Sequence, residues 1–530
     1  MWSNRAFSRR TFVIALVLFI AATCYIYPKH IDRLNEKTSP LCADIPIPDH
    51  YWTLTDAEMT PFIEIPRLRP VEVGHTVCVR VVLPARLSRN TSSSSAIIYT
   101  PLPGTPWDSI MLDMVGNSTG ISVPVDLQPA QAMRGRSSSG GGGGNGGVHV
   151  YEADVLLRDV DVFVLAGFIE YRDAEWNFEG GLPIVEYEPE PLFTAHSVSV
   201  AVVDSTGTSP YSLERHESLP LCRESNPDGR WVSVDDIPFD QTELLPSDNH
   251  NRTWLPYTCR MQRYDYRTFA QCLVDKYPVM HVYGDSNTRR YLKLITLLGN
   301  WCKQPGMPAW GLCICEDFNE RSFDRFNPLD RNVLIDMDPI NGGRPPTGQF
   351  SMLMAPANKS RIYLRKWDGL TPHNSDLAWS ANLDMGVEQA FGHAQVVVFS
   401  LTNWDVAFTT RGYFASQIQI LLDKIESNYA NDTKIIVRTG QYFCCRIDKS
   451  PTKRQYSRMR NRSFDRYLIG QFEERFGATR SLSIWDVASL EERRPIEVRK
   501  TDPAKCASNH ARSELIDIEN QVLFNHMCNY

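Results

Sequence analysis

The sequence predicts an α/β three-layer domain with a parallel sheet, preceded by an immunoglobulin-type β-sandwich and an N-terminal transmembrane helix. Short alternating β patterns dominate residues 61–204, whereas apolar strands and amphipathic helices alternate after Tyr277. An uncharged apolar run covers residues 11–27. A chain of 530 residues is long enough for two or three domains of this kind.

The apolar run from Thr11 to Tyr27 determines the expected compartment. It lies at the short end of what spans a bilayer, and Pro28 follows it directly. Arginines precede the run, which favours a cytosolic N-terminus, and no convincing signal-peptide cleavage site follows it. We expect a single-pass type II protein of the Golgi or another secretory-pathway membrane, or a secreted protein if the segment is cleaved. Its parts would be a cytosolic tail (1–10), a signal-anchor helix (11–27), a stem (28–60) and a lumenal remainder.

Sequons and cysteines agree with a lumenal location. Six Asn-x-Ser/Thr motifs are spread along the chain, at Asn90, Asn117, Asn251, Asn358, Asn431 and Asn461. One of the 13 cysteines, Cys24, lies in the apolar run, and the other twelve make the even number expected of disulfides. The alternative is metal binding, but Cys313-Ile-Cys315 and the adjacent Cys444-Cys445 lack the usual zinc spacing. We therefore expect disulfides and no metal.

Charge and composition restrict the class of partner. The net charge of −7 gives no basic surface for nucleic acid, and 42 % apolar residues suffice for buried cores. A glycan or a small molecule fits this charge better than a polyanion. We expect no nucleic-acid partner.

Residues 61–204 are predicted to form the β-sandwich. Alternation is clear over Val71–Val82 and in three later runs, and no helical period of useful length interrupts them. The segment 137–147, rich in Ser and Gly, is predicted to be a flexible loop. Because such a sandwich carries no reaction by itself, we expect it to space the chain or to bind a protein partner.

The second half, 205–530, begins with a turn-rich, cysteine-containing lead segment over 217–272. After it, apolar strands are predicted at 278–283, 394–401, 434–439 and 482–488. Helices are predicted at 288–301, 412–429, 463–477 and 510–527. This alternation is typical of an α/β domain with helices on both faces of its sheet.

Ser286 is the candidate nucleophile. It stands in Tyr283-Gly-Asp-Ser-Asn287, between a predicted apolar strand and a predicted helix. An open α/β sheet binds its ligand at this edge, and a strand-to-helix turn exposes a serine hydroxyl while backbone N–H groups face a developing oxyanion. The alternative interpretation is an ordinary helix N-cap, for which Asp and Ser are both favoured.

His510 is the candidate general base, because it opens the last predicted helix, where the chain returns to the edge that carries Ser286. His281 and His393 adjoin predicted strands, where packing roles are expected, and His526 is expected to pack beside a disulfide. Asn403 follows the strand 394–401, so that its amide can donate to an oxyanion. A turn-forming role is the alternative for Asn403.

Several motifs together resemble the PC-esterase group of GDSL/SGNH-like proteins. The resemblance is closest to the neurexophilin-and-PC-esterase family and more distant to plant trichome-birefringence-like O-acetyltransferases. It covers about 217–530 and, less specifically, 60–204, where the family has an immunoglobulin-like region. The residues that carry it are 229–231, 254–259, 269–273, 282–289, 397–401, 484–486, His510, 520–522 and Cys528.

The resemblance implies a serine esterase or O-acyltransferase (most simply O-acetyl) that acts on complex carbohydrates, with Ser286 as nucleophile and His510 as base. The family's D-x-x-H acid is absent, because Ala507 stands three residues before His510. Asp502 is the first candidate for the acid and Asp486 the second. The family's G-x-N element is also altered, since Leu401 replaces its glycine.

No metal or organic cofactor is implied, although a transferase would need an acyl donor as co-substrate. The alternative function is a non-catalytic lumenal or secreted binding or adhesion protein with a degenerate esterase scaffold. The missing acid favours this alternative. A glycosyltransferase would share the type II layout, but we assign no D-x-D motif to a nucleotide-sugar metal.

Overall fold

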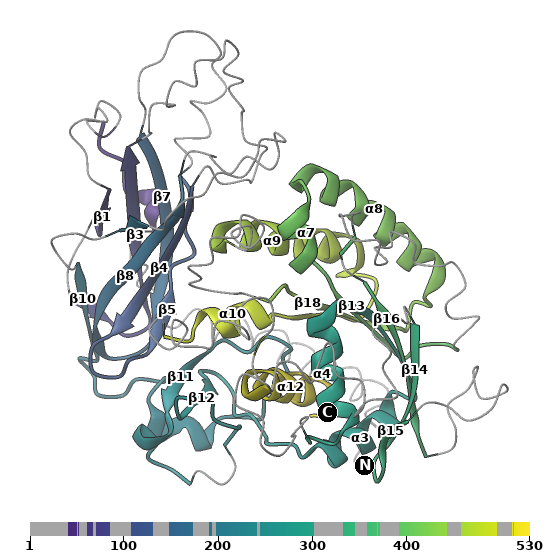
Figure 1. The fold of residues 1–530 in the computed structure, drawn as a ribbon. Helices are drawn as coiled ribbons and strands as arrows, with labels where there is room; N and C mark the ends of the chain where they lie inside the picture. The colour runs from purple at the N-terminus through teal and green to yellow at the C-terminus, as the bar shows by residue number, and fades with distance from the viewer. Residues whose placement is uncertain are drawn as a thin grey trace, which may run out of the picture.

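The computed structural model describes residues 41–49, 51, 61–66, 70–84, 108–130, 148–172, 190–192, 198–240, 244–300, 332–344, 358–367, 369–370, 392–441, 457–495, 511 and 513–529. Along the chain these residues form a two-sheet β unit, a lead segment and an α/β unit (Figure 1). The predicted cytosolic tail and transmembrane helix lie outside them. None of the helices in the described part of the chain is long and apolar enough to cross a membrane.

The β unit is a sandwich of two sheets. Among the described strands one sheet has the order β1-β3-β7-β6 and the other β2-β10-β8-β4-β5, with β9 paired to β8. Neighbouring strands are antiparallel except β10 and β2. The bounds are β1 Phe62–Glu64, β2 Val71–Glu72, β3 His75–Pro84, β4 Ser109–Gly116, β5 Ser122–Pro124, β6 Gln128–Pro129, β7 Val148–Leu157, β8 Asp161–Tyr171, β9 Glu190–Pro191 and β10 Ser199–Val203.

Alternating side chains of the two sheets form the core of the sandwich. Val79 and Val81 of β3 are buried against the same cluster as Leu112 of β4 and Phe163 and Leu165 of β8. Each such side chain contributes roughly 1.5–3 kcal/mol when it is removed from water. The period-two pattern of the sequence therefore corresponds to a buried face on each sheet.

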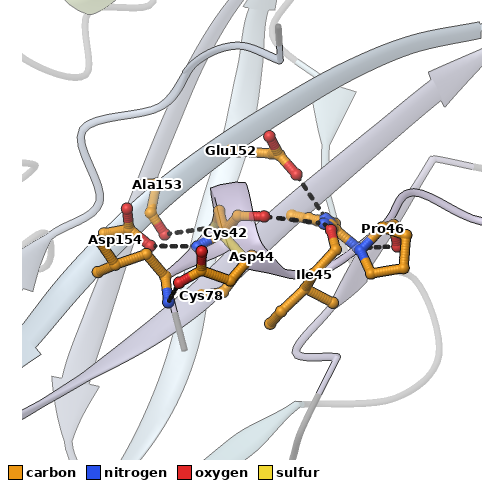
Figure 2. The surroundings of a disulfide bond; sticks show 10 residues. Cys42, Asp44, Ile45, Pro46, Cys78, Glu152, Ala153 and Asp154 are labelled. Atoms are coloured by element: carbon orange, nitrogen blue, oxygen red, sulfur yellow. Dashed lines mark hydrogen bonds and ion pairs between the residues drawn. A yellow bond between two sulfur atoms is a disulfide. The ribbon is translucent and has the colours of Figure 1, made fainter. Parts of the chain in front are cut away.

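Residues 41–49, which fall within the predicted stem, pack against this sandwich. Cys42, in the short 3-10 helix η1 (Cys42–Asp44), is joined by a disulfide to Cys78, and its N–H donates to Asp154 Oδ1 at 2.7 Å (Figure 2). The buried Arg80 donates to backbone carbonyls of the same segment. This part of the chain is therefore fixed to β3 covalently and by hydrogen bonds.

The lead segment is a disulfide-closed hairpin attached to the α/β unit. Cys222 and Cys259 form a disulfide across it, and Trp231 donates its indole N–H to the carbonyl of Leu490 at 2.8 Å. Its elements are η4 Leu213–Ser218, β11 Gly229–Ser233, η5 Val234–Asp236 and β12 Arg252–Pro256.

The sheet of the α/β unit has the order β15-β14-β16-β13-β17-β18-β19 among the described strands. The strands from β16 to β19 in this order are parallel, while β14 and β15 form an antiparallel edge. Numbered along the chain, the parallel strands have the order 2-1-3-4-5, so the winding of the chain reverses between β13 and β17. The bounds are β13 Val279–Gly284, β14 Asn332–Asp338, β15 Gly342–Arg344, β16 Ser360–Lys366, β17 Val396–Ser400, β18 Lys434–Arg438 and β19 Leu482–Trp485.

Helices cover both faces of this sheet (Figure 1). On one face of the sheet, Val282 and Val398 pack against helices α3, α4, α10 and α12. On the other face, Tyr283 and Phe399 pack against helices α8 and α9, and Val406 of α7 belongs to the same core. This three-layer arrangement confirms the predicted α/β class with a parallel sheet. The bounds are α3 Tyr266–Lys276, α4 Ser286–Thr296, α7 Asn403–Phe408, α8 Arg411–Asn428, α9 Arg458–Phe476, α10 Val487–Glu492 and α12 Ser513–Cys528.

Several element ends differ from the prediction. The strand predicted over 482–488 ends at Trp485, because Asp486 accepts a hydrogen bond from the backbone N–H of Ser489 at 3.0 Å and so begins α10. The predicted helix 288–301 runs instead from Ser286 to Thr296.

Three disulfides lie within the described residues, which confirms the prediction of disulfide bonding. Besides those at Cys42 and Cys222, a bond joins Cys272 in α3 to Cys528 at the end of α12. The cysteines outside the described residues are Cys24, Cys302, Cys313, Cys315, Cys444, Cys445 and Cys506.

Helix α9 connects the two folded units. The N–H of Arg458, its first residue, donates to Glu170 of β8 at 2.8 Å, and its guanidinium donates to the carbonyl of Leu112 in β4 at 2.8 Å. Met459 belongs to the hydrophobic core of the sandwich. The sandwich therefore packs directly against the α/β unit.

Candidate functional site

The candidate site lies at the carboxyl edge of the parallel sheet, where the winding reverses. Ser286 begins α4 two residues after β13 ends, and Asn403 begins α7 three residues after β17 ends. β13 and β17 are neighbours in the sheet. Open α/β sheets bind ligands at this position, because the loops that leave the two strands diverge to opposite faces.

Ser286 is the accessible residue of an otherwise buried strand and helix. From Val279 to Thr296 every residue is buried except Ser286, which is partly exposed. Gly284 permits this tight turn, because a Cβ there would collide with Thr288 and lie 2.9 Å from Cβ of Ser400. The turn therefore presents the serine at the surface while its neighbours pack inside.

Asp285, and not Ser286, caps helix α4. Its Oδ1 accepts hydrogen bonds from the backbone N–H groups of Asn287 at 2.9 Å and Thr288 at 3.3 Å. The capping role proposed as the alternative for this motif thus belongs to the aspartate. Ser286 occupies the first helical position, where the backbone dipoles stabilise developing negative charge.

The side chain of Asn403 is held in place at both ends of its amide. One N–H donates to Asp285 Oδ2 at 2.9 Å, and Oδ1 accepts from the backbone N–H of Gln441 at 2.7 Å. An amide carries two N–H donors, and Asp285 uses one of them. The other can donate to an oxygen at the edge of the sheet.

Thr402 places Asn403 through an unusual backbone conformation. Its φ is 82°, in the left-handed region that a β-branched residue rarely adopts. Its hydroxyl donates to Asp465 Oδ1 at 2.9 Å, and the same oxygen accepts from the backbone N–H of Gly440 at 3.0 Å. Asp465, from α9, thus joins the loops after β17 and β18.

Asp465 is protonated over part of the neutral range. Burial raises its pKa to about 7, although the hydrogen bond from Gly440 and the charge of Arg462 act in the opposite direction. Gly440 packs closely against the same residues, since a Cβ there would collide with Thr402 and lie 3.1 Å from Asn403 Oδ1. The support beneath Asn403 is therefore closely packed and sensitive to pH.

A buried polar network lies behind Gln441. Its side-chain N–H groups donate to Glu491 and Glu519, each at 2.9 Å. Glu519 also accepts from Arg438 at 2.7 Å, and both of these side chains are fully buried. The network orients Gln441, whose backbone N–H in turn orients Asn403.

Asp486, the second candidate for the catalytic acid, lies at the same edge but after β19. Its carboxylate accepts from Thr439 Oγ1 at 3.0 Å, pairs with Arg462 and caps α10. Burial raises its pKa, but Arg462 and the hydrogen bonds of Ser489 and Thr439 outweigh that effect and lower it overall. Its oxygens are therefore already engaged.

His510 and Asp502, the predicted base and acid, lie outside the described residues. The structure describes the other histidines that the sequence singled out. His281 bonds Tyr429, and His526 bonds the carbonyl of Arg223. Burial lowers their pKa values to about 3 and about 4, which makes both poor general bases near neutrality. His393 is half-exposed and pairs with Asp432.

Sequence reasoning missed Thr402, Gly440, Gln441 and Asp465 as parts of the site. Gly440 and Gln441 directly follow a predicted apolar strand. The same position after a strand identified Asn403, so this signal could also have identified Gly440 and Gln441. No local pattern marks Asp465, because it lies in the middle of helix α9.

One cluster in the described part of the chain has the composition of a metal site: Cys42, Cys78 and Asp154. Its two sulfur atoms form a disulfide, and its carboxylate accepts a backbone hydrogen bond (Figure 2). Thiolates are the metal-binding form of cysteine, so this cluster does not fit a metal.

The chain was also compared with known proteins. It matches no protein-family model and no curated protein.

Proposed function

We propose that this chain is a serine-dependent acyl esterase or O-acyltransferase of the SGNH-like kind, acting on complex carbohydrates in the secretory pathway. Ser286 Oγ attacks the carbonyl carbon of an acyl ester while His510 accepts the hydroxyl proton. The backbone N–H of Ser286 and the amide of Asn403 hold the oxyanion. The ester C–O bond then breaks, and His510 returns the proton to the departing alcohol. Water or a sugar hydroxyl takes the acyl group from Ser286 in the second step.

The observation that carries this proposal is the setting of Ser286. It is the one partly exposed residue between Val279 and Thr296, and it stands at the edge where the winding of the sheet reverses. Asn403 reaches that edge from the neighbouring strand and is hydrogen-bonded to Asp285, the residue before the serine. The three-layer fold with its parallel sheet also agrees with what the family resemblance implies.

Asp502 is the preferred acid partner for His510. Asp486 is held by Ser489, Thr439 and Arg462, so it would have to give up these contacts to orient an imidazole. Asp502 and His510 are eight positions apart in the sequence, between α10 and α12. We therefore assign the acid to Asp502.

A fluorophosphonate probe, which reacts with activated serines, tests the proposal. We expect the wild-type chain and the Ser416→Ala variant to be labelled and the Ser286→Ala variant to remain unlabelled. Ser416 is a surface serine of α8 and serves as the matched control. His510→Ala should reduce labelling strongly, and Asp502→Ala should reduce it more than Asp486→Ala. A wild-type chain with its disulfides intact that takes up no probe would contradict the proposal.

The proposed lumenal location is supported by the disulfides, because such bonds persist in oxidising compartments. Extraction of cell membranes with alkaline carbonate tests the anchor over 11–27. An anchored chain stays in the membrane pellet, whereas a chain cleaved after this segment appears in the soluble lumenal or secreted fraction.

The second candidate function is a non-catalytic lumenal or secreted binding protein. Ala507 in place of the family's acid favours it. So do the outward-facing valines of the sandwich, Val160, Val162 and Val203, which are 51 %, 46 % and 37 % exposed and lie on or beside the adjacent strands β8 and β10. Absence of probe labelling, together with loss of partner binding on Val162→Ser, would favour this candidate.

A further inference from the structure

Exposed apolar side chains gather at one corner of the sandwich. Val160, Val162 and Val203 are three of the eight large apolar side chains that are exposed in the described part of the chain. In the pairing of β8 with β10, Ala201 lies opposite Val162. Continuing the same register places Val203 opposite Val160. Opposite residues of antiparallel strands share a face, so these side chains lie together on the outer face of the sheet.

Asn117 lies beside Val162 on the side away from β10. The pairing of β4 with β8 ends with Gly116 opposite Phe163. The row continues for one more residue, because the backbone N–H of Asn117 donates to the carbonyl of Val162 at 3.0 Å. The Asn117 side chain is exposed. Asn117, Val162 and Ala201 therefore form one row across the outer face of the sheet.

The turn that carries Asn117 is fixed by the carboxylate of Asp161. The hydroxyl groups of Ser118 and Thr119 donate to its Oδ1 and Oδ2, each at 2.7 Å. The backbone N–H of Thr119 donates to Oδ2 at 2.9 Å. The position of Asn117 beside Val162 is thus set by the fold of this turn.

Asn117 is also the acceptor of a sequon, Asn117-Ser-Thr119. Its side chain makes no hydrogen bond with any other described residue. Strands of a sheet are spaced by about 4.8 Å, so Val162 lies about one spacing from Asn117 and Val203 about two spacings, or about 10 Å. The first two sugar rings of an N-linked glycan span that distance.

We infer that an N-linked glycan on Asn117 lies over Val160, Val162 and Val203 and covers this apolar corner. The C–H faces of the sugar rings contact the valine methyl groups, while the hydroxyl groups face water. A group tethered by a short flexible link has an effective concentration in the millimolar range, so weak contacts suffice to keep it there. The inference rests on the proposed lumenal location and is independent of the acyl chemistry.

The competing occupant of this corner is a protein partner or a second copy of the chain. Such a partner would have to accommodate a bulky glycan attached within the same row of side chains. The sequon at the centre of the corner therefore favours the glycan as the occupant. Ile420 of α8, which is 43 % exposed and belongs to the α/β unit, serves as the control for exposure without this glycan.

Carbene footprinting with a diazirine probe tests the cover, because carbenes insert into exposed C–H bonds. The full chain is purified from secretory membranes in a mild detergent, and its glycans are removed enzymatically from the folded protein. Since apolar contact scales with area, covering half or more of the exposed valine surface predicts that labelling of the three valines rises about twofold or more on removal. Labelling of Ile420 should not change.

Two variants make the test specific. Asn117→Gln should reproduce the rise in valine labelling, whereas Asn431→Gln, which removes a sequon at another exposed position, should not. Val162→Ser should speed the enzymatic release of the glycan from Asn117 and leave its release from Asn431 unchanged. Enzymatic removal acts on the wild-type chain after folding, so the test does not depend on the folding of a variant.

The inference is overturned if Asn117 carries no glycan in a chain that is glycosylated elsewhere, or if valine labelling is unchanged after removal. An equal rise at Ile420 also overturns it. Protection of the valines that persists without the glycan would assign the corner to a protein partner or a second copy. A chain without any glycan would overturn both this inference and the lumenal location, whereas fluorophosphonate labelling decides the acyl chemistry separately.

Discussion

Asn403 donates a side-chain hydrogen bond to the carboxylate of Asp285 at 2.9 Å, and this bond joins the loops after two neighbouring strands across 118 positions of sequence. The same carboxylate caps the helix that Ser286 begins. The nucleophile and the proposed oxyanion donor therefore have a common support. A change at Asn403 is expected to affect both the chemistry and the fold.

Asn403→Ala should slow fluorophosphonate labelling of Ser286 by roughly two to three orders of magnitude, because one oxyanion donor is lost. It should also lower the free energy of unfolding by about 1–3 kcal/mol, since Asp285 and the N–H of Gln441 each lose a buried partner. Labelling time courses and thermal unfolding measure the two effects. Asn428→Ala, at a half-buried position at the end of α8, is the control. An unchanged labelling rate in Asn403→Ala would remove Asn403 from the mechanism.

Gly284→Ala should destabilise the α/β unit by about 1–3 kcal/mol or prevent its folding, because the added methyl group collides with Thr288. Gly470→Ala is the matched control. Position 470 lies inside α9 with open space around it, so alanine there should stabilise the helix by about 0.5–1 kcal/mol. Unfolding midpoints of the two variants should move in opposite directions; equal shifts would contradict the geometry of the turn.

The raised pKa of Asp465 predicts a pH-dependent stability. This carboxyl has a pKa of about 7 in the folded chain and an ordinary value near 3.8 when unfolded. Between pH 3.8 and pH 7 the folded state binds more protons than the unfolded state. The contribution of Asp465 to the free energy of unfolding therefore falls as pH rises, by up to about 1.4 kcal/mol per pH unit. Above about pH 7 this contribution no longer changes with pH.

Asp465→Asn should remove this dependence, because the amide oxygen can still accept from Thr402 and Gly440 and the group does not titrate. Denaturant unfolding of both chains at pH 5, 6, 7 and 8, followed by tryptophan fluorescence, measures the difference. The variant should gain on the wild type as pH rises through this range. A difference that is the same at pH 5 and pH 8 would show that Asp465 is ionised throughout.

The sequons divide into accessible and inaccessible positions. The Asn117, Asn251, Asn358 and Asn431 side chains are exposed, whereas Asn461 is 6 % exposed inside helix α9. We expect folded chain purified from secretory membranes to carry glycans at some of the exposed sites and none at Asn461. Mass spectrometry of peptides after enzymatic deglycosylation in heavy-oxygen water measures this occupancy, and a glycan at Asn461 would contradict the packing of α9.

The sequence predicted those strands and helices whose buried residues form a simple pattern of apolar letters in the sequence. β13, β17 and β18 are nearly continuous apolar runs because helices cover both faces of the sheet, and their bounds differ from the predicted ones by one or two residues. Strands β14 and β16 were missed. Each carries charges that pair inside the sheet, such as Arg361 and Asp336 at 2.8 Å, and these charges interrupt the apolar signal.

The site was predictable only where it lies next to a strand in the sequence. Ser286 and Asn403 each follow an apolar strand, and these two strands are neighbours in the sheet. A hydrogen bond from Asn403 to Asp285 joins the loops that follow them. The support from Asp465 is a contact across 63 positions, and the left-handed backbone at Thr402 has no sequence signature. Such features depend on tertiary packing rather than on local pattern.

The bond between Cys272 and Cys528 encloses nearly the whole α/β unit, since its partners are 256 positions apart. A protease that cuts any loop inside that span releases no fragment, because both pieces remain covalently linked. Nicked molecules would therefore migrate as intact chains in electrophoresis without reductant and separate into two bands only after reduction. A single cut between Cys272 and Cys528 would therefore escape detection by electrophoresis without a reductant.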